Sequence, residues 1–308
     1  MTNFNQKLLH TLDEVVQQSL SLPLLSYSDL PQYRRQLTLG LKQYSTAINA
    51  IFLGMQSATP GMAFLSGYQN AIRCLDPKCP ADVLAAFCVS EKGIKKPWDM
   101  QTQIIAAVEN SAANNPQQSY CLTGQKGYVM LLPDDLDRLY VIAKDESKQL
   151  RCVYLSSRAA GLTITEPLKA PFIQDIPHTG VGFAQVDIPA SQLMPIDGHQ
   201  QANKPFRYWE DIHVTLAMMA WMFRAIVDAG GEKSDTLLEA MNQLVTLITQ
   251  SPEYYSLESF SIFEACQGVL ESSSKGLSKE SLQQWQADQP LLLMGQKIRR
   301  LIQTKMAP

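Results

Sequence analysis

The spacing of apolar residues changes twice along this chain and divides it into three segments. Before about residue 84, apolar residues recur with the spacing of an amphipathic helix, as in residues 8–20. From about residue 84 to 190 the apolar runs are short and partly alternating, which is typical of strands. Helical spacing returns after Pro205. The pattern predicts an α+β multidomain chain with an N-terminal helical region, a central antiparallel β-barrel or sandwich, and a C-terminal four-helix bundle.

Domain boundaries are expected at these changes, giving domains over residues 1–83, 84–195 and 196–308. Turns rich in Asn, Asp and Pro separate the strand-like runs of the central segment, and Asn114-Asn115-Pro116 is one of them. The expected strands lie within residues 84–89, 101–108, 120–132, 139–143, 152–155, 161–165 and 181–188.

The last segment predicts four helices. Residues 209–229 are apolar on most faces, which indicates a helix buried on several sides, and Gly230-Gly231 is expected to end it. Ser234 or Asp235 is expected to cap the second helix, and Ser251-Pro252 to start the third. The fourth is expected to begin at Ser278 and to break at Pro290. Three methionines of the first helix are most simply core residues: Met218, Met219 and Met222.

Composition restricts the classes of partner. With a net charge of -3 and a pI near 5.8, a nucleic-acid or anionic-membrane surface is not the expected partner. No apolar run approaches the roughly 20 residues of a membrane span, and the N-terminus shows no secretory signal. The six cysteines and four histidines show no zinc-type spacing. We therefore expect a cytoplasmic protein without a metal centre.

Four short motifs carry a family resemblance. Phe87-Cys88-Val89-Ser90-Glu91 is similar to an aromatic-x-hydrophobic-Thr-Glu strand end, and Gln101-Thr102 follows at the spacing of a Lys/Arg-Thr pair. Residues 120–126, Tyr-Cys-Leu-Thr-Gly-Gln-Lys, are similar to a Tyr-x-Leu-Asn-Gly-x-Lys hairpin, and residues 186–193 to a Val-x-Val-Pro-x-x-x-Leu stretch. In this order and spacing, the motifs resemble those of the acyl-CoA dehydrogenase superfamily, in a shortened and divergent form.

The resemblance implies FAD as cofactor and the α,β-dehydrogenation of an acyl thioester, such as an acyl-CoA. An isoalloxazine ring needs hydrogen-bond donors at its polar edge and an apolar slot around the rest. Ser90 matches a ring-binding Thr and keeps the hydroxyl, Tyr128 falls at a Trp, and Met130 falls at a second Thr and loses the hydroxyl. The residues implied to bind the cofactor are Phe87, Val89, Ser90, Tyr128 and Met130. A homodimer or homotetramer is also implied.

The reaction needs one carboxylate base. Alignment through Arg224-Ala225 places Glu210 where two subfamilies carry this base, and places Asp211 where an Arg should follow. Arg207 lies about one helical turn earlier. The alternative interpretation of Glu210 is a first-turn acid favoured by the helix dipole, and the neighbouring Asp211 favours that alternative. Three later acids are candidates without an aligned position: Glu258, Glu264 and Asp288.

The segments expected to contact the phosphates and adenine of FAD depart from the family pattern. Residues 92–99 replace the Pro-Gly-Ala-Gly-Ser-Asp loop and are one residue shorter, and Gly230-Gly231 stands where an Arg-x-x-Phe-Gly is expected. Lys92, Lys95 and Lys96 either meet phosphates or form a solvated loop. Trp98, Trp209 and His178 carry weaker pocket hypotheses, with a structural role as the alternative. The second functional hypothesis is a non-catalytic member of the fold that has lost FAD and acts as a binding or scaffold protein.

Overall fold

The computed structural model describes residues 3–94, 96–107, 119–132, 134–165, 167–251 and 254–306, with backbone alone for residues 3–10. Four predicted features lie wholly or partly outside these residues, namely Lys95, the end of the 101–108 strand, the turn at 114–116 and Pro252. The chain divides into two compact units. The helical unit contains residues 1–82, 171–176 and 207–308, and the β-unit contains residues 83–170 and 177–206.

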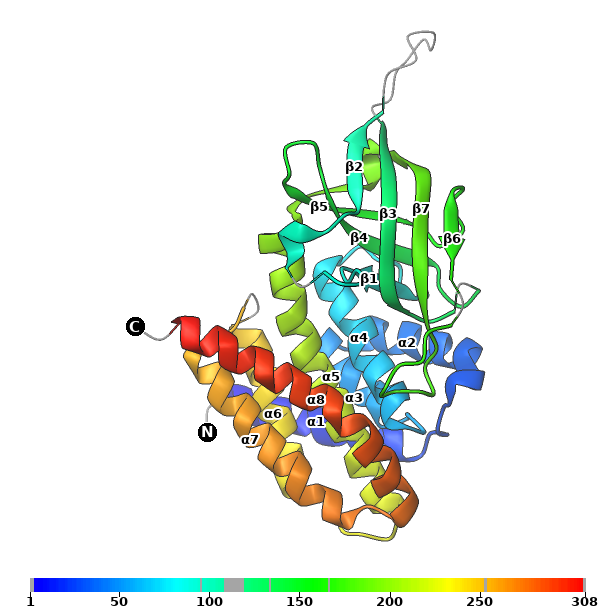
Figure 1. The fold of residues 1–308 in the computed structure, drawn as a ribbon. Helices are drawn as coiled ribbons and strands as arrows, with labels where there is room; N and C mark the ends of the chain where they lie inside the picture. Colours follow the sequence, from blue (N-terminus) through cyan, green and yellow to red (C-terminus); the bar gives the residue numbers. More distant parts are fainter. Residues whose placement is uncertain are drawn as a thin grey trace. The chain divides into compact units, whose positions relative to one another are not determined.

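Helices from both ends of the chain form the helical unit (Figure 1). The described helices are α1 (Asn3–Leu20), α2 (Leu30–Gln43), α3 (Thr46–Gly54), α4 (Pro60–Leu75), α5 (Lys204–Asp228, entering this unit at Arg207), α6 (Asp235–Gln250), α7 (Leu257–Ser273) and α8 (Lys279–Met306). The N-terminal helices α1 and α3 contact α6, and α4 contacts α8. The division of the chain into three consecutive domains stays a prediction. The two compact units are defined by contacts in space, and the helical unit combines segments that are distant in the sequence.

The core of this unit follows the predicted apolar faces. Met218, Met219 and Met222 of α5 expose none of their surface, so their predicted place in the core is confirmed. Gly230 ends the helix with φ +83, as predicted for Gly230-Gly231, and the Gly231 N–H donates to the Ile226 carbonyl in a Schellman arrangement. Ser234 caps α6 by accepting from the Leu237 N–H.

Three helix predictions were wrong. The apolar spacing from Leu37 to Met55 predicts one long helical face, but Ser45 caps α3 by accepting from the Ile48 N–H, so a new helix starts within it. The third C-terminal helix begins after Ser256, its capping residue, and not at Ser251-Pro252. α8 continues through Pro290. Pro290 leaves the Gln286 carbonyl without its helical donor, but Gln286 is exposed, so water can satisfy that carbonyl.

One sheet of eight described strands forms the β-unit. The strands are β1 (Ala85–Cys88), β2 (Gln103–Ala106), β3 (Ser119–Met130), β4 (Arg138–Lys144), β5 (Leu150–Ser156), β6 (Leu162–Ile164), β7 (His178–Pro189) and β8 (Leu193–Asp197). Their order is β6-β7-β3-β2-β4-β5-β8, and β1 pairs with β4. The two longest strands, β3 and β7, are antiparallel neighbours (Figure 1).

The sheet is mixed, which corrects the prediction of an antiparallel one. β1 and β2 both pair with β4 in parallel, and the other described pairings are antiparallel. Ala85 aligns with Arg138, a partner that no tight turn connects to it. Turn residues in a sequence indicate which neighbouring strands form hairpins. They carry no information about a parallel partner that is distant in the sequence, such as β4 for β1.

Candidate functional site

A buried acid organises the segment that follows β1. The Glu91 carboxylate accepts hydrogen bonds from the backbone N–H groups of Gln101, at 2.6 Å, and Thr102, at 3.2 Å. It also accepts from Nζ of Lys126 on β3 at 2.7 Å. The Glu91 side chain exposes 3% of its surface and the Lys126 side chain 0%. Charges this deeply buried are tolerated when they are paired and hydrogen-bonded, as these are.

Thr102 and Gly124 complete this arrangement. The Thr102 hydroxyl donates to the Gln125 carbonyl at 3.0 Å. Gly124 has φ +130, and a Cβ at this position would lie 2.5 Å from Cα of Thr102. Only glycine therefore allows the two backbones to approach this closely. Three motifs that are separate in the sequence meet here, at Glu91, Thr102 and Gly124–Lys126, and we call this set the Glu91 cluster.

Hydrogen bonds outweigh desolvation at Glu91. Burial raises the pKa of Glu91. The Gln101 N–H and the Lys126 ammonium lower it, and their combined effect is larger than that of burial, so the pKa lies below its ordinary value. Burial lowers the pKa of Lys126, and Glu91 opposes that change. The sequence motifs contain both residues, but sequence reasoning missed their pairing. The available signal was a Glu that follows one apolar run and a Lys that lies within another strand-like run, since each charge needs a partner if it is buried.

Two of the five residues predicted to bind the cofactor lie together at the surface of the β-unit. The Gly127 N–H donates to the Ser90 carbonyl at 2.9 Å, which places the segment after β1 beside the end of β3. Ser90 is exposed. Tyr128 exposes 63% of its surface and has φ +54, an unusual backbone conformation for a residue with an aromatic side chain. The chain thus exposes a hydroxyl and an aromatic ring on two segments that this backbone hydrogen bond joins.

The other three predicted residues are less accessible. Val89 is half-buried, and its carbonyl accepts from Nζ of Lys126 at 3.3 Å. Phe87 is half-buried and packs against Phe206 with ring centroids 4.4 Å apart. Met130 exposes 5% of its surface and lies opposite His178 on β7. Phe87 and Met130 therefore pack within the β-unit, and they offer less exposed surface than Ser90 and Tyr128.

The loop after Glu91 is open to solvent in its described part. Lys92 and Lys96 are exposed, and Gly93 has φ +80 with no atom within 4 Å of the place a Cβ would occupy. Trp98 exposes 57% of its surface, and its ring meets His199 edge-on at 5.5 Å.

In the helical unit, Glu210 lies on α5 and is half-buried. The helix begins at Lys204, so Glu210 and Asp211 lie beyond its first turn, and the first-turn position in the helix-dipole interpretation is wrong. Burial raises the pKa of its carboxyl to about 7, Arg207 opposes this rise and Asp211 adds to it. Among the residues that the structure describes, none forms a hydrogen bond with the Glu210 carboxyl. A carboxyl with a pKa close to neutrality and no partner has the properties of a general base.

The other acidic candidates have different surroundings. Glu258 and Glu264 are exposed on α7. Asp288 of α8 is buried and accepts from the Ile173 N–H at 2.6 Å. Burial raises the pKa of Asp288 to about 6, and the Ile173 hydrogen bond opposes that rise. Asp288 thus holds the 171–176 segment within the helical unit.

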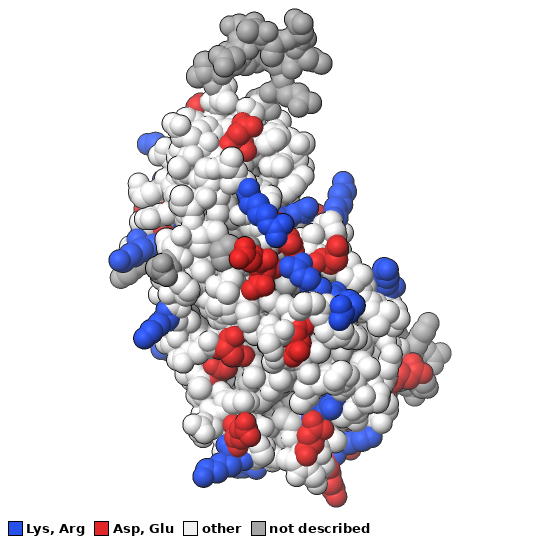
Figure 2. Space-filling view, turned by 90° about the vertical axis from the view of Figure 1, so that its right-hand side faces the viewer, with Lys and Arg blue, Asp and Glu red and all other residues white. Residues whose placement is uncertain are grey.

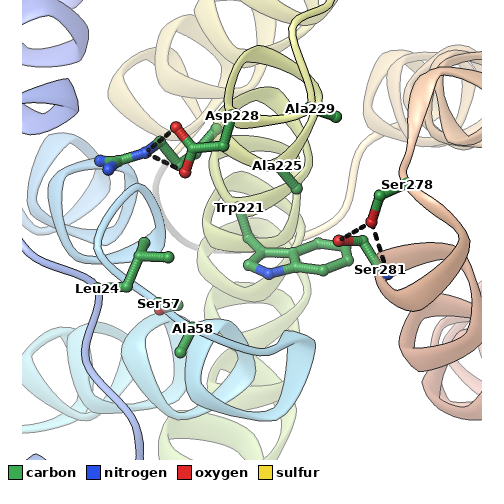
Figure 3. A pocket seen from close by; sticks show the side chains of 10 residues that line it. Leu24, Ser57, Ala58, Trp221, Ala225, Asp228, Ala229, Ser278 and Ser281 are labelled. Atoms are coloured by element: carbon green, nitrogen blue, oxygen red, sulfur yellow. Dashed lines mark hydrogen bonds and ion pairs between the residues drawn. The ribbon is translucent and has the colours of Figure 1, made fainter.

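A cavity of about 190 Å³ lies elsewhere in the helical unit (Figure 3). Trp221 and the Arg224–Asp228 ion pair of α5 line one side, and Ser278 and Ser281 at the start of α8 line another. None of the residues predicted from the sequence to act in catalysis or cofactor binding lines it.

Charges of both signs are interspersed on the face drawn in Figure 2. Among the described residues, no helix combines the length and apolar character that crossing a membrane requires.

Comparison with solved structures identifies the fold. Butyryl-CoA dehydrogenase from Megasphaera elsdenii is 13% identical, with a TM-score of 0.64 over 98% of this chain and 99% of that one. Glutaryl-CoA dehydrogenase from Mycobacterium smegmatis is 13% identical, with a TM-score of 0.60 over 92% and 86%. An FAD complex of PigA is 14% identical, with a TM-score of 0.61 over 96% and 92%.

No protein-family model matches the sequence, and no curated protein matches it. The structural likeness covers nearly the whole chain at low identity, so it establishes architecture and leaves chemistry to be argued from the residues. The chain has the fold of the acyl-CoA dehydrogenases.

Proposed function

We propose that this protein is an FAD-dependent dehydrogenase that removes a proton and a hydride from adjacent carbons of an acyl thioester. The observation that carries the proposal is the hydrogen bond between the Gly127 N–H and the Ser90 carbonyl, which brings exposed Ser90 close to the segment that carries exposed Tyr128. The ion pair of the Glu91 cluster joins the same two segments. A barrel or sandwich form of the sheet and a four-helix bundle of α5–α8 belong to the same proposal, as does a homodimer or homotetramer.

The residues fit the ring side of the cofactor. The exposed hydroxyl of Ser90 offers a hydrogen bond to the polar edge of an isoalloxazine, and the exposed Tyr128 ring offers a stacking face. Val89 offers apolar contact, while Phe87 and Met130 pack within the β-unit. When bound, FAD supplies the hydride acceptor. Lys92 and Lys96 are exposed cations that can meet its phosphates as point charges.

We assign the abstraction of the substrate proton to Glu210. Its carboxylate takes the proton from the carbon next to the thioester carbonyl, a task that a pKa of about 7 suits near neutral pH. This favours the base over the helix-dipole interpretation, because an exposed first-turn acid would keep an ordinary pKa. The roles of Ser90 and Tyr128 in the β-unit and of Glu210 in the helical unit are proposed separately.

A flavin spectrum tests the cofactor. Purified full-length protein, incubated with FAD and desalted, should show the absorption bands of bound flavin. An acyl-CoA should then bleach these bands. Glu210→Gln should keep the flavin and slow bleaching by about 10²–10⁴-fold. Glu258→Gln, on the exposed face of α7, is the matched control and should bleach at the wild-type rate.

A second candidate is a binding protein that keeps the fold without flavin. The buried, apolar Met130 favours it, because the resemblance places a hydroxyl at that position. A protein that stays colourless after FAD incubation would support this candidate and overturn the first.

A further inference from the structure

A network of three side chains joins α5 to the C-terminal part of the helical unit at Asp211. The Asp211 carboxylate accepts a hydrogen bond from the Tyr255 hydroxyl. Its Oδ2 atom also lies 3.1 Å from Nη1 of Arg299 on α8. The Asp211 side chain exposes 16% of its surface and that of Arg299 11%, so this ion pair is largely shielded from water.

The network is held in place from α8 and α7. Arg299 lies over the Phe263 ring at 4.6 Å, an arrangement that fixes the guanidinium by a cation–π contact. A Cβ at Gly295 would lie 3.3 Å from Oδ1 of Asp211, so the absence of a side chain lets the α8 backbone approach the carboxylate. Asp211 therefore has a fixed position and two donors to its carboxylate.

This fixed charge is the sequence neighbour of Glu210. The family resemblance places an Arg at position 211, whereas this chain has an Asp there whose guanidinium partner comes from another helix. We propose that Asp211, anchored by Tyr255 and Arg299, is a positioning residue that holds a carboxylate at a fixed place beside Glu210. The inference rests on the proposed role of Glu210 as the base.

The charges around Glu210 support this role. The described groups that act on it are Arg207 and Asp211, both on α5. Arg207 makes no ion pair within 4 Å among the described residues, and its charge also acts on Tyr254 and Tyr255. Because Asp211 is occupied by Arg299, it is not drawn into an (i, i+4) pair with Arg207. Both charges thus remain effective at Glu210, and Asp211 disfavours its ionised form.

Titration of the Glu210 carboxyl tests the proposal without requiring activity. In full-length protein labelled at the glutamate side-chain carboxyl carbons, the NMR signal of Glu210 is assigned by its loss in Glu210→Gln. Asp211→Asn should lower the titration midpoint by on the order of one pH unit. Arg299→Gln should raise it, because the charge of Asp211 is then uncompensated.

The opposite directions distinguish electrostatics from loosening. A loosened fold would move the midpoint downward, toward the ordinary value of a glutamate, in both variants. Asp228→Asn is the matched control, since it removes an equivalent Arg-paired charge about 25 Å further along α5 and should leave the midpoint unchanged. An unmoved midpoint in Asp211→Asn, or a downward shift in Arg299→Gln, overturns the proposal. If Asp211→Asn fails to fold, Arg299→Gln is decisive alone, because electrostatics and loosening move its midpoint in opposite directions.

The proposed function is tested by a different measurement, namely flavin binding and turnover. A protein without flavin or turnover contradicts the dehydrogenase and leaves the titration readable. If turnover is observed, the acidic limb of the kcat–pH profile should move to lower pH in Asp211→Asn, and an unmoved limb overturns the positioning role.

Discussion

The Nζ atom of Lys126 lies 2.7 Å from Oε1 of Glu91, and the two side chains are almost completely removed from solvent. This contact joins the segment after β1 to β3. Through the Gln101 and Thr102 amides it also fixes the chain that enters β2. The pair therefore stabilises the backbone on which Ser90 and Tyr128 are displayed.

Removing one member of this pair should destabilise the protein strongly. Lys126→Met and Glu91→Gln each leave a buried group without its main partner, which costs about 3–5 kcal/mol of unfolding free energy. Urea denaturation measures the loss. Asp228→Asn removes a more exposed partner, of which 43% is accessible, and should cost less than about 1 kcal/mol. Similar losses in all three variants would contradict a special role for the buried pair.

A single methyl group at Gly124 should disrupt the same cluster. Gly124→Ala places Cβ 2.5 Å from the Thr102 backbone, at a φ of +130 that alanine rarely adopts. We expect a loss of about 2–4 kcal/mol in unfolding free energy. Gly127→Ala is the matched control in the same strand, because no atom lies within 4 Å of its Cβ position. If the two variants have equal stability, the close approach at Thr102 does not constrain the fold.

Periodicity predicted the type of most elements, and the misses have identifiable causes. β8 was not predicted, because it is short and contains Pro195, a residue that argues against a strand. The break between α2 and α3 depends on Ser45, whose capping bond is local and leaves the apolar spacing unchanged. The parallel partner of β1 depends on a distant strand, about which the turn residues carry no information.

The candidate site was predicted as separate motifs. Glu91, Thr102 and Lys126 each belong to a motif visible in the sequence, but their meeting point requires the pairing of β2 with β3 and of β1 and β2 with β4, which is set by tertiary packing. The partners of Asp211 were not predicted at all, since Tyr255 and Arg299 lie in later elements. The local sequence around Glu210 predicted two acids in the first turn of a helix. It carried no information about the burial that raises the pKa of Glu210.

The raised pKa of Glu210 predicts a pH-dependent effect on stability. Burial raises the folded-state pKa from 4.5 to about 7, so the folded protein holds an extra proton between these values. The stability from this group is fully present below the unfolded pKa and is lost as pH rises through the folded pKa. Glu210→Gln mimics the protonated form. It should be more stable than wild type by about 1–3 kcal/mol near pH 8 and closely similar near pH 5.

Urea unfolding at the two pH values checks this, with Glu258→Gln as the control for an exposed glutamate. A Glu210→Gln variant with wild-type stability near pH 8 would mean that Glu210 has an ordinary pKa, and would remove the electrostatic support for its role as base.

Tyr128 predicts opposite effects on stability and on cofactor binding. Its φ of +54 is unfavourable for any residue with a Cβ, and its ring is largely exposed, so the ring contributes little to folding. Tyr128→Gly should therefore raise the unfolding free energy by about 1 kcal/mol in the absence of FAD. It should also weaken FAD binding by about tenfold, since an aromatic stacking contact is worth roughly 0.5–1.5 kcal/mol.

Lys148→Gly is the control for relief of backbone strain. Lys148 has φ +62 in the exposed turn between β4 and β5, so glycine there should give a similar gain in stability. FAD affinity, measured by fluorescence titration, should stay at the wild-type value in Lys148→Gly and in Tyr128→Phe, which keeps the ring. If Tyr128→Gly binds FAD as tightly as these controls, then the exposed ring is not a flavin contact, and the strained backbone at position 128 requires another explanation.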